Sequence, residues 1–290
     1  KTALRNNHGD IVFRELPLPP VGPNDIRLAV KACGICGSDI HGGAAHDKEF
    51  RKFGHEVAGI VIETGCGVNR LKIGDAVALD SATPCGQCPN CRNKDVHLCT
   101  DIQSFFFYDC FGFAEEIVAP AICAMKIAEL DFAEATLQEP LGVALDMVKL
   151  ADVKPGMNAL VIGIGPIGAM ALPLLRLHGV NRLFVSDFPD HPRRAVMAGK
   201  FAVDACIAPD KLAGYEFGCR IDRVLVTAPP AVLPAAMAAV SEAGIISYIG
   251  IGYDKAYLTV NADDFHLRER QLRASCASPA HYGAQARELL

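Results

Sequence analysis

Short apolar runs and longer mixed stretches alternate through the second half of the chain. Residues 158–163 form an aliphatic run of strand length, and residues 169–179 have the length and composition of a helix. Further strands are predicted at 182–187, 204–208, 221–228, 245–252 and 272–278, with helices at 232–244 and 284–290. Strands that alternate with helices predict a doubly wound parallel sheet with crossover connections.

The first half, up to about Leu145, has a different pattern. It is rich in predicted strands, and glycine and proline interrupt it repeatedly. We therefore expect an α/β protein with two domains, residues 1–145 and residues 146–290. With 290 residues, of which 51% are hydrophobic, the chain can provide a core for both domains.

A glycine-rich turn joins the strand at 158–163 to the helix that follows it. Gly163, Gly165 and Gly168 form the pattern G-x-G-x-x-G, with Pro166 and Ile167 inside it. The first glycine allows a tight turn, the second lets the backbone approach a pyrophosphate, and the third lets the helix pack on the strand. Free N–H groups at the helix N-terminus attract phosphate. We predict that these residues bind a dinucleotide.

The next predicted strand ends at Asp187, about 20 residues beyond the glycine motif. An acid at this place hydrogen-bonds the ribose hydroxyls and repels a 2′-phosphate, which favours NAD over NADP. Arg193 and Arg194 follow in the sequence, and a cationic pair near the ribose would weaken that preference. The strand ends near Ala228 and Gly250 are expected to lie against the nicotinamide.

The net charge and the cysteine content mainly exclude certain classes of partner and location. The net charge is -5 with both signs mixed, so neither nucleic acid nor an anionic membrane is indicated as a partner. No apolar run is long enough to span a bilayer, and no secretory leader is visible. Seven scattered cysteines are interpreted as free thiols of a protein in the reducing cytoplasm: Cys33, Cys66, Cys110, Cys123, Cys206, Cys219 and Cys276.

Four other cysteines lie close together in the sequence CGQCPNCRNKDVHLC. Cys85, Cys88, Cys91 and Cys99 have the spacing C-x2-C-x2-C-x7-C, and four thiolates complete a tetrahedral zinc shell. Iron–sulfur clusters also use four cysteines, but the proline-flanked ferredoxin pattern is absent. Disulfides are the other alternative, although cysteines two residues apart make poor partners for each other. A zinc ion saturated by four thiolates has no open position, so this site is predicted to be structural.

A catalytic metal site needs mixed ligands and a free coordination position. Suitable residue types occur in CGICGSDIHGG at 33–43, in GHE at 54–56 and in QEPLGVA at 138–144. The candidate ligands in these segments are Cys36, His55, Glu56 and Glu139. Each is weak evidence alone, and the combination is much stronger.

These motifs, in this order, resemble those of the zinc-dependent medium-chain dehydrogenases, the superfamily of alcohol and polyol dehydrogenases. The resemblance covers essentially the whole chain, from CGICGSDIHGG through the four-cysteine segment and EPLGVA to VIGIGPIG. It implies a GroES-like, β-rich catalytic domain that carries both metal sites, followed by a Rossmann domain. It also implies a further segment beyond Leu290 that returns to the catalytic domain.

The resemblance assigns roles to individual residues. Cys36 and His55 match ligands of the catalytic zinc, and Glu56 matches a residue that binds the zinc or moves in and out of its shell. Glu139 stands where simple alcohol dehydrogenases have Cys and the polyol, glucose and threonine branches have Glu, and it reaches zinc directly or through a water. Ser38 matches the hydroxyl that takes the substrate proton.

Other matched positions lie around that relay and the cofactor. His41 matches the outer member of the proton relay, and Arg194 matches the family arginine before the next helix. Asp39 is expected to orient a neighbour rather than to react. Gly37 replaces an arginine that some relatives place near the cofactor pyrophosphate.

The implied function is oxidation of a secondary alcohol, a polyol or cyclitol, to a ketone by an enzyme with two zinc ions per subunit and NAD. Alternatives are a threonine or simple-alcohol dehydrogenase, or a non-catalytic zinc-binding paralogue. Family members are usually homodimers or homotetramers, and we expect one of these here.

Overall fold

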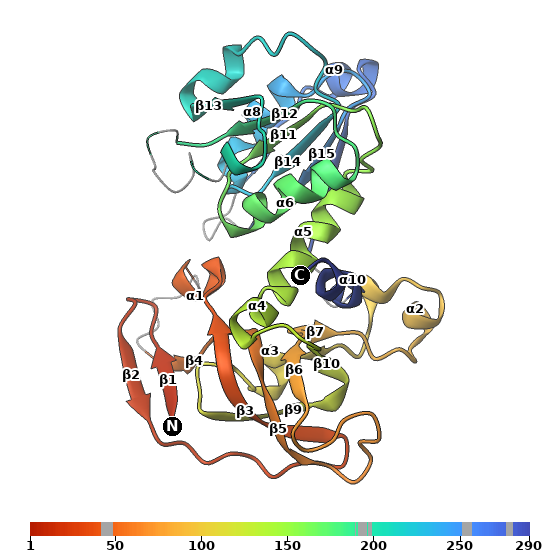
Figure 1. The fold of residues 1–290 in the computed structure, drawn as a ribbon. Coiled ribbons are helices and arrows are strands. Elements are labelled where there is room, and N and C mark those ends of the chain that lie inside the picture. Colours follow the sequence, from red (N-terminus) through yellow and green to blue (C-terminus); the bar gives the residue numbers. More distant parts are fainter. Residues whose placement is uncertain (42–48, 189, 191–195, 197–198, 251–256, 277–280) are drawn as a thin grey trace. The chain divides into compact units, whose positions relative to one another are not determined.

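The computed structural model describes residues 1–41, 49–188, 190, 196, 199–250, 257–276 and 281–290 (Figure 1). They group into two compact units, one of Lys1–Gly142 with Ser278–Leu290 and one of Val143–Ala277. Each unit has its own buried apolar core.

Antiparallel sheets form the first unit. Five strands lie in the order β10-β6-β5-β3-β9, three in the order β2-β1-β4, and two form the pair β7-β8. The strands are β1 Thr2–Arg5, β2 Ile11–Arg14, β3 Asp25–Gly34, β4 Arg51–Lys52, β5 Glu56–Thr64, β6 Ala76–Leu79, β7 Ala82–Thr83, β8 Gln103–Ser104, β9 Glu116–Pro120 and β10 Ala124–Lys126. β5 buries most of its residues because it lies inside the sheet, between β6 and β3.

Short helices accompany these strands. They are α1 Gly37–His41, α2 Pro89–Arg92, α3 Phe105–Tyr108, α4 Phe132–Thr136, α5 Gln138–Leu150 and α10 Gly283–Leu289, with single 3-10 turns at Val96–Leu98 and Ala121–Cys123. Asp131 begins α4 with a capping box, because its carboxylate accepts from the Glu134 N–H and the Glu134 side chain accepts from the Asp131 N–H. The division between the two units falls within α5.

A parallel sheet forms the second unit, in the order β13-β12-β11-β14-β15-β16. The strands are β11 Ala159–Ile162, β12 Leu183–Ser186, β13 Ala205–Ile207, β14 Arg223–Val226, β15 Ile245–Tyr248 and β16 Gln271–Ala274. The helices are α6 Pro166–Leu177, α8 Leu233–Ala239 and α9 Ala262–Leu267, with 3-10 segments at Pro209–Gly214 and Pro230–Val232. This confirms the predicted α/β class and the doubly wound sheet.

The central strands bury every residue. All residues of β11, β12 and β14 are buried, as expected for parallel strands that are covered on both faces. β11 lies between β12 and β14, so the strand order reverses there. A reversal of this kind opens a crevice at the carboxyl ends of the strands, where ligands bind in such sheets.

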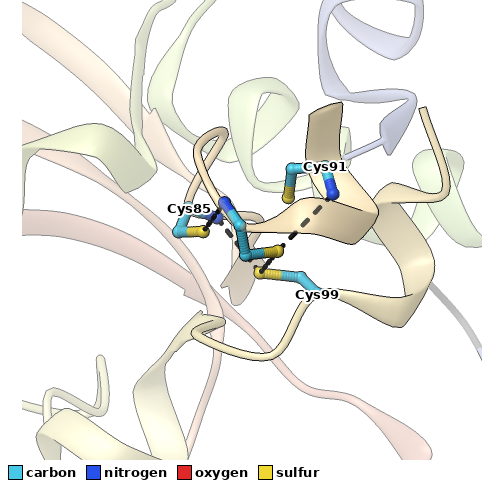
Figure 2. Close-up of side chains that lie close together, drawn as sticks. Cys85, Cys91 and Cys99 are labelled. Atoms are coloured by element: carbon cyan, nitrogen blue, oxygen red, sulfur yellow. Dashed lines mark hydrogen bonds between the residues drawn. The ribbon is translucent and has the colours of Figure 1, made fainter. Parts of the chain in front are cut away.

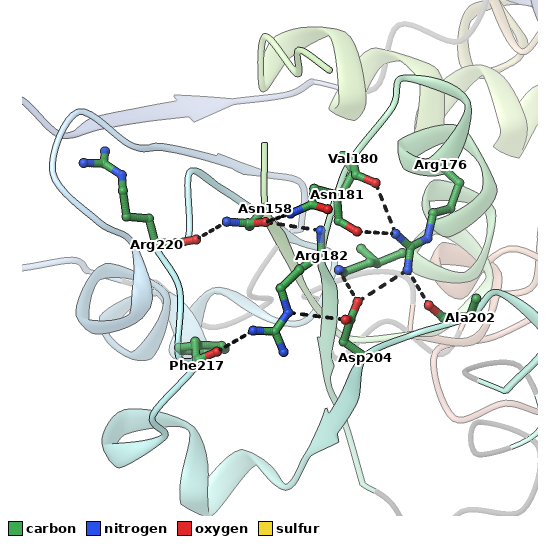
Figure 3. A network of polar contacts seen from close by, with 10 residues as sticks. Asn158, Arg176, Val180, Asn181, Arg182, Ala202, Asp204, Phe217 and Arg220 are labelled. Carbon is green, nitrogen blue, oxygen red and sulfur yellow. Dashed lines mark hydrogen bonds and ion pairs between the residues drawn. The ribbon is translucent and has the colours of Figure 1, made fainter. Parts of the chain in front are cut away.

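Polar side chains tie together the opposite edge of this sheet, where the strands begin (Figure 3). Asp204 accepts from the Leu183 N–H at 2.8 Å and from Arg182 Nε at 3.3 Å. Arg176 donates to the carbonyl oxygens of Val180 and Asn181 at 3.1 and 2.9 Å. The network holds the strand starts in register, at the edge away from the glycine motif.

The C-terminal helix groups with the first unit. The expected second domain is residues 146–290, with a return to the first domain after Leu290. In the structure, Ser278–Leu290 groups with the first unit. α10, dark blue in Figure 1, lies there because Gly283 packs closely on Asp80 and Met125, and Arg287 donates to the Lys126 carbonyl.

The helices of the described residues are short. α5 has 13 residues and α6 has 12, and no helix in this part of the chain combines the length and apolar character needed to cross a bilayer.

Candidate active site and metal centres

The mixed-ligand site forms where two separate segments meet in the first unit. Cys36 precedes α1, His55 lies directly before β5, and Glu56 begins β5. Their ligand atoms all lie within 4.8 Å of one another, and His55 and Glu56 are buried. Sulfur, nitrogen and oxygen donors at this separation fit a zinc ion of the catalytic type.

Asp39 holds these two segments together. Its Oδ2 accepts from the Cys36 N–H at 2.9 Å, and its Oδ1 accepts from the Gly54 N–H at 3.1 Å. Oδ1 also lies 3.8 Å from His55 Nδ1. The buried Asp39 carboxylate therefore fixes the backbone at Cys36 and next to His55. Hydrogen bonds of this kind commonly orient metal-binding side chains. This geometry agrees with the expectation that Asp39 orients its neighbours.

Glu139 lies at the start of α5 and is buried, with 6% of its surface exposed. Its Oε1 accepts a 2.6 Å hydrogen bond from Ser81 Oγ. Burial raises the pKa of Glu139 to about 7; the His55 charge and the Ser81 hydrogen bond act to lower this pKa, and the charges of Glu56 and Cys36 act to raise it. Glu139 is thus electrostatically linked to the other three candidates, although it is not within 4.8 Å of all of them.

Burial also raises the pKa of Glu56, against the lowering effect of His55, and the Asp39 charge adds to the rise. Three carboxylates, Glu56, Glu139 and Asp39, therefore share a buried region with one histidine. Such a group is stabilised by a bound cation, because the ion favours their charged forms.

The candidate proton relay lies on α1. Ser38 is exposed on this helix, and His41 ends it, with a side chain outside the described part of the structure. Arg5 donates to the Ile40 carbonyl and so fixes the C-terminal end of α1. Phe106 of α3 is 70% exposed, and its ring centroid lies 6.3 Å from that of His55.

Two residues near this site carried no signal in the sequence. Ser81 and Asp80 follow β6, and each binds the start of α5: Ser81 binds Glu139, and Asp80 accepts from Gln138 Nε2 at 3.0 Å. A polar pair after a short strand usually begins an ordinary turn, so only the three-dimensional pairing reveals them.

The four-cysteine segment forms a compact second cluster (Figure 2). The ligand sulfurs of Cys85, Cys88, Cys91 and Cys99 lie within 4.8 Å of one another. Backbone N–H groups of this segment donate to the sulfurs: Cys85 N to Cys99 Sγ at 3.3 Å, Cys88 N to Cys85 Sγ at 3.4 Å, and Cys91 N to Cys88 Sγ at 3.5 Å. Donors directed at sulfur stabilise thiolates, the form that binds metal.

The thiols of this cluster influence one another strongly. Backbone N–H groups of Cys91 and Thr100 lower the pKa of Cys88 to about 6, whereas burial and the neighbouring Cys88 sulfur raise the pKa of Cys91 to about 12. Four sulfurs this close hold their charge together only with a cation between them, which fits a structural zinc ion.

The glycine motif forms a turn that suits a dinucleotide. Gly163 has φ +90°, and a Cβ there would lie 3.0 Å from the Ala228 backbone. At Gly168 a Cβ would lie 2.0 Å from the Gly163 carbonyl oxygen, so the helix can approach the strand only with glycine. A Cβ on Gly165 would meet no atom within 4 Å apart from its chain neighbours, which leaves room for a pyrophosphate beside Pro166, the first residue of α6.

Asp187 lies directly after β12 and is 4% exposed. Its Oδ2 accepts from the Ile164 N–H inside the glycine motif, and its Oδ1 accepts from the Phe188 N–H, both at 2.7 Å. The acid therefore braces the turn on which a pyrophosphate would lie.

The other cofactor candidates lie at different places. Ala228 and Gly250 are adjacent, because a Cβ on Gly250 would lie 3.2 Å from the Ala228 carbonyl oxygen. Ile167 lies in the first turn of α6. Arg193 and Arg194 lie outside the described residues.

Comparison with known proteins identifies the family. The sequence model named Alcohol dehydrogenase GroES-like domain matches residues 22–129. An L-threonine 3-dehydrogenase from Pyrococcus abyssi is 32% identical over 261 residues, which cover 85% of this chain and 74% of that protein. This chain belongs to the zinc-dependent medium-chain dehydrogenases.

Other members of the family are similar over shorter stretches. An L-threonine 3-dehydrogenase from Bacillus velezensis is 35% identical over 73% of this chain and 62% of its own length. A sorbitol dehydrogenase from Arabidopsis thaliana is 35% identical over 66% of this chain and 54% of its own length. The matched part thus spans less than two thirds of both relatives.

Solved structures of the family share the fold over almost the whole chain. A zinc-binding dehydrogenase from Sinorhizobium meliloti, solved with NADP, has a TM-score of 0.84 at 25% identity. The match covers 99% of this chain and 87% of the Sinorhizobium chain. A structure from E. coli named short chain alcohol dehydrogenase, solved with NADH, has a TM-score of 0.83 at 26% identity, and the match covers 99% of this chain and 86% of that chain. Solved structures with this fold therefore include one with NADP and one with NADH.

Proposed function

We propose that this dehydrogenase oxidises a secondary alcohol of the polyol or cyclitol class to a ketone, with hydride transfer to NAD. The carrying observation is the cluster of Cys36, His55 and Glu56, with sulfur, nitrogen and oxygen donors within 4.8 Å and Glu139 buried nearby. Glutamate rather than cysteine at position 139 favours the polyol branch over simple alcohol dehydrogenases. The similarity to a protein named sorbitol dehydrogenase supports the same class.

The residues of this chain would divide the work as follows. Cys36, His55, Glu56 and Glu139 would hold the catalytic zinc ion, and Asp39 orients the segments that carry Cys36 and His55. When bound, zinc supplies a Lewis acid for the substrate hydroxyl, and NAD supplies the hydride acceptor.

The proton of the substrate hydroxyl would leave through α1. The exposed Ser38 hydroxyl would accept this proton as it gives up its own, and His41 would pass a proton to solvent. The cofactor would lie on Gly163, Gly165, Pro166, Ile167 and Gly168, with Asp187 near the ribose and Ala228 and Gly250 near the nicotinamide. Arg194 is proposed to lie near the adenosine.

The finer properties of the whole protein are proposed on the same basis. Residues 1–145 form the catalytic domain together with the C-terminal helix, and the residues between these two parts bind the cofactor. Each subunit carries two zinc ions, the second on Cys85, Cys88, Cys91 and Cys99. NAD is preferred over NADP because Asp187 is acidic. The protein is a cytoplasmic homodimer or homotetramer.

A threonine dehydrogenase is the second candidate, because two relatives with that name match this chain at 35% and 32% identity. Glu139 is compatible with either substrate class. The deciding property is the substrate pocket, since a site built to bind an ammonium group rejects a substrate that lacks it.

The test is NAD reduction by the full-length protein with polyols, cyclitols, threonine and simple alcohols. We expect turnover of a polyol or cyclitol that a zinc chelator abolishes. The Cys36→Ser variant should lose this activity but keep the zinc ion of the four-cysteine site. Turnover of threonine alone would assign the second function, and activity that survives both the chelator and Cys36→Ser would refute the metal mechanism.

A further inference from the structure

Two consecutive residues after β6 bind two consecutive residues at the start of α5. Ser81 Oγ donates to Glu139 Oε1 at 2.6 Å, and Gln138 Nε2 donates to Asp80 Oδ1 at 3.0 Å. All four residues are buried, with exposures of 7%, 6%, 1% and 4% in the order Ser81, Glu139, Gln138 and Asp80. The first of these bonds involves a candidate metal ligand directly.

A glutamate at the start of a helix can point in several directions, because it has three rotatable side-chain bonds. Fixing such a side chain in one orientation costs conformational entropy. The Ser81 hydrogen bond imposes this order before any ion binds, and it occupies Oε1. The carboxylate then presents its other oxygen in one orientation, which favours binding through a single oxygen.

The second bond supports the first. Asp80 is adjacent to Ser81, and Gln138 is adjacent to Glu139, so the two bonds hold the two backbone segments at a fixed distance. Glu139 can therefore not relax away from Ser81 by a small shift of α5. Gly283 of α10 also lies close against the Asp80 carboxylate.

We propose that Ser81 is a positioning residue that holds the Glu139 carboxylate ready to bind the ion beside Cys36, His55 and Glu56. This inference rests on the proposed metal centre. Neither the four-cysteine site nor the dinucleotide turn involves Ser81. Loss of its hydroxyl should therefore weaken one metal site selectively.

The test measures metal binding rather than turnover. A chromophoric chelator competes for zinc with the wild-type chain and with Ser81→Ala. The Cys36→Ser variant is measured in the same way, and the zinc ion that it lacks is assigned to the site beside Cys36. We expect Ser81→Ala to bind this ion at least about 10-fold more weakly, as is usual when a partner of a metal ligand is removed. The ion on the four cysteines should be held unchanged in the same sample.

Two variants separate positioning from a general loss of stability. Ser81→Thr keeps the hydroxyl and should restore the affinity to within about 3-fold. Ser247→Ala removes a buried serine hydroxyl that donates to the Met147 carbonyl at 3.1 Å in the second unit, and it should leave the affinity unchanged. The visible spectrum of Co²⁺ at the site should change in Ser81→Ala and stay the same in Ser247→Ala.

A double-mutant cycle with Glu139→Ala gives the sharpest result. If Ser81 acts through Glu139, Ser81→Ala has no further effect on metal affinity once Glu139 is absent. An equal effect in both backgrounds overturns the inference, as does a Ser81→Ala chain with wild-type affinity and spectrum. A wild-type chain that binds no ion dependent on Cys36 refutes the proposed metal centre and the inference together.

Discussion

Asp80 is a buried acid whose protonation should change the stability of the chain. Burial raises its pKa to about 6, although the hydrogen bond from Gln138 lowers it. The folded chain therefore binds the Asp80 proton more tightly than the unfolded chain, in which the pKa is near 3.8. The resulting stabilisation is complete below the unfolded pKa, and it is lost as the pH rises through the folded pKa.

The metal-free chain should show this effect in urea unfolding between pH 4 and pH 7. The contribution of Asp80 to the free energy of unfolding should fall by about 2 kcal/mol over this range, and Asp80→Asn should lack the fall. Asp25→Asn, which changes a half-buried acid at the start of β3, serves as the control. Parallel pH profiles of the wild type and Asp80→Asn would contradict the assignment.

Single residues also show where sequence interpretation stops. Cys36, His55 and Glu56 could be selected because their types and motifs are distinctive, and Asp39 could be expected to orient a neighbour. Ser81 could not be selected, because its role depends on a partner 58 positions away. Hydrogen bonds between distant segments leave no periodic pattern in the chain.

At the scale of the elements, Asp204 contributes to the stability of the parallel sheet at the edge where the strands begin. Asp204 is partly buried, which acts to raise its pKa, but the Leu183 N–H and the Arg182 guanidinium outweigh this and leave the pKa below its ordinary value. Its stabilising contribution is therefore present above the unfolded pKa, and it is lost as the pH falls through the folded pKa.

Replacement of Asp204 should therefore destabilise the chain at neutral pH. We expect Asp204→Ala to lower the free energy of unfolding by about 2 kcal/mol at pH 7, because it removes charged hydrogen bonds to Leu183 and Arg182. The difference from wild type should shrink as the pH falls towards 3. Asp210→Ala, at an exposed acid of a nearby 3-10 segment, should have no such effect. A constant difference across this pH range would exclude the ion-pair explanation.

The elements of the two units differ in how far the sequence predicts them. β11, β12 and β14 are covered on both faces, so each is mostly apolar and could be located directly, although β12 ends in Ser186 and β14 begins with Arg223. The strands of the first unit pair over long distances, as β3 does with β9, and their order could not be derived from local patterns. Helix 284–290 was predicted correctly, but an amphipathic helix carries no information about the unit on which it packs.

For the whole molecule, the metal and the dinucleotide should protect different parts of the chain. The candidate metal ligands all lie in the first unit, and the glycine motif and Asp187 lie in the second. We expect a zinc chelator to speed amide hydrogen exchange around β5 and the four-cysteine segment and to leave β11–β16 unchanged. NAD should slow exchange at the turn after β11. Equal responses of both units to either treatment would show that the sites are not separate.

The helix α10 makes the second unit an insertion within the first, since Val143–Ala277 is one continuous stretch between two parts of the other unit. The ribosome therefore synthesises the whole of the second unit before Ser278–Leu290, which belong to the first unit. Gly283 can pack against Asp80 only after that stretch has been made. The usual order of folding, in which the N-terminal unit finishes first during synthesis, therefore does not hold for this chain, because the first unit can take up α10 only after its neighbour has been synthesised.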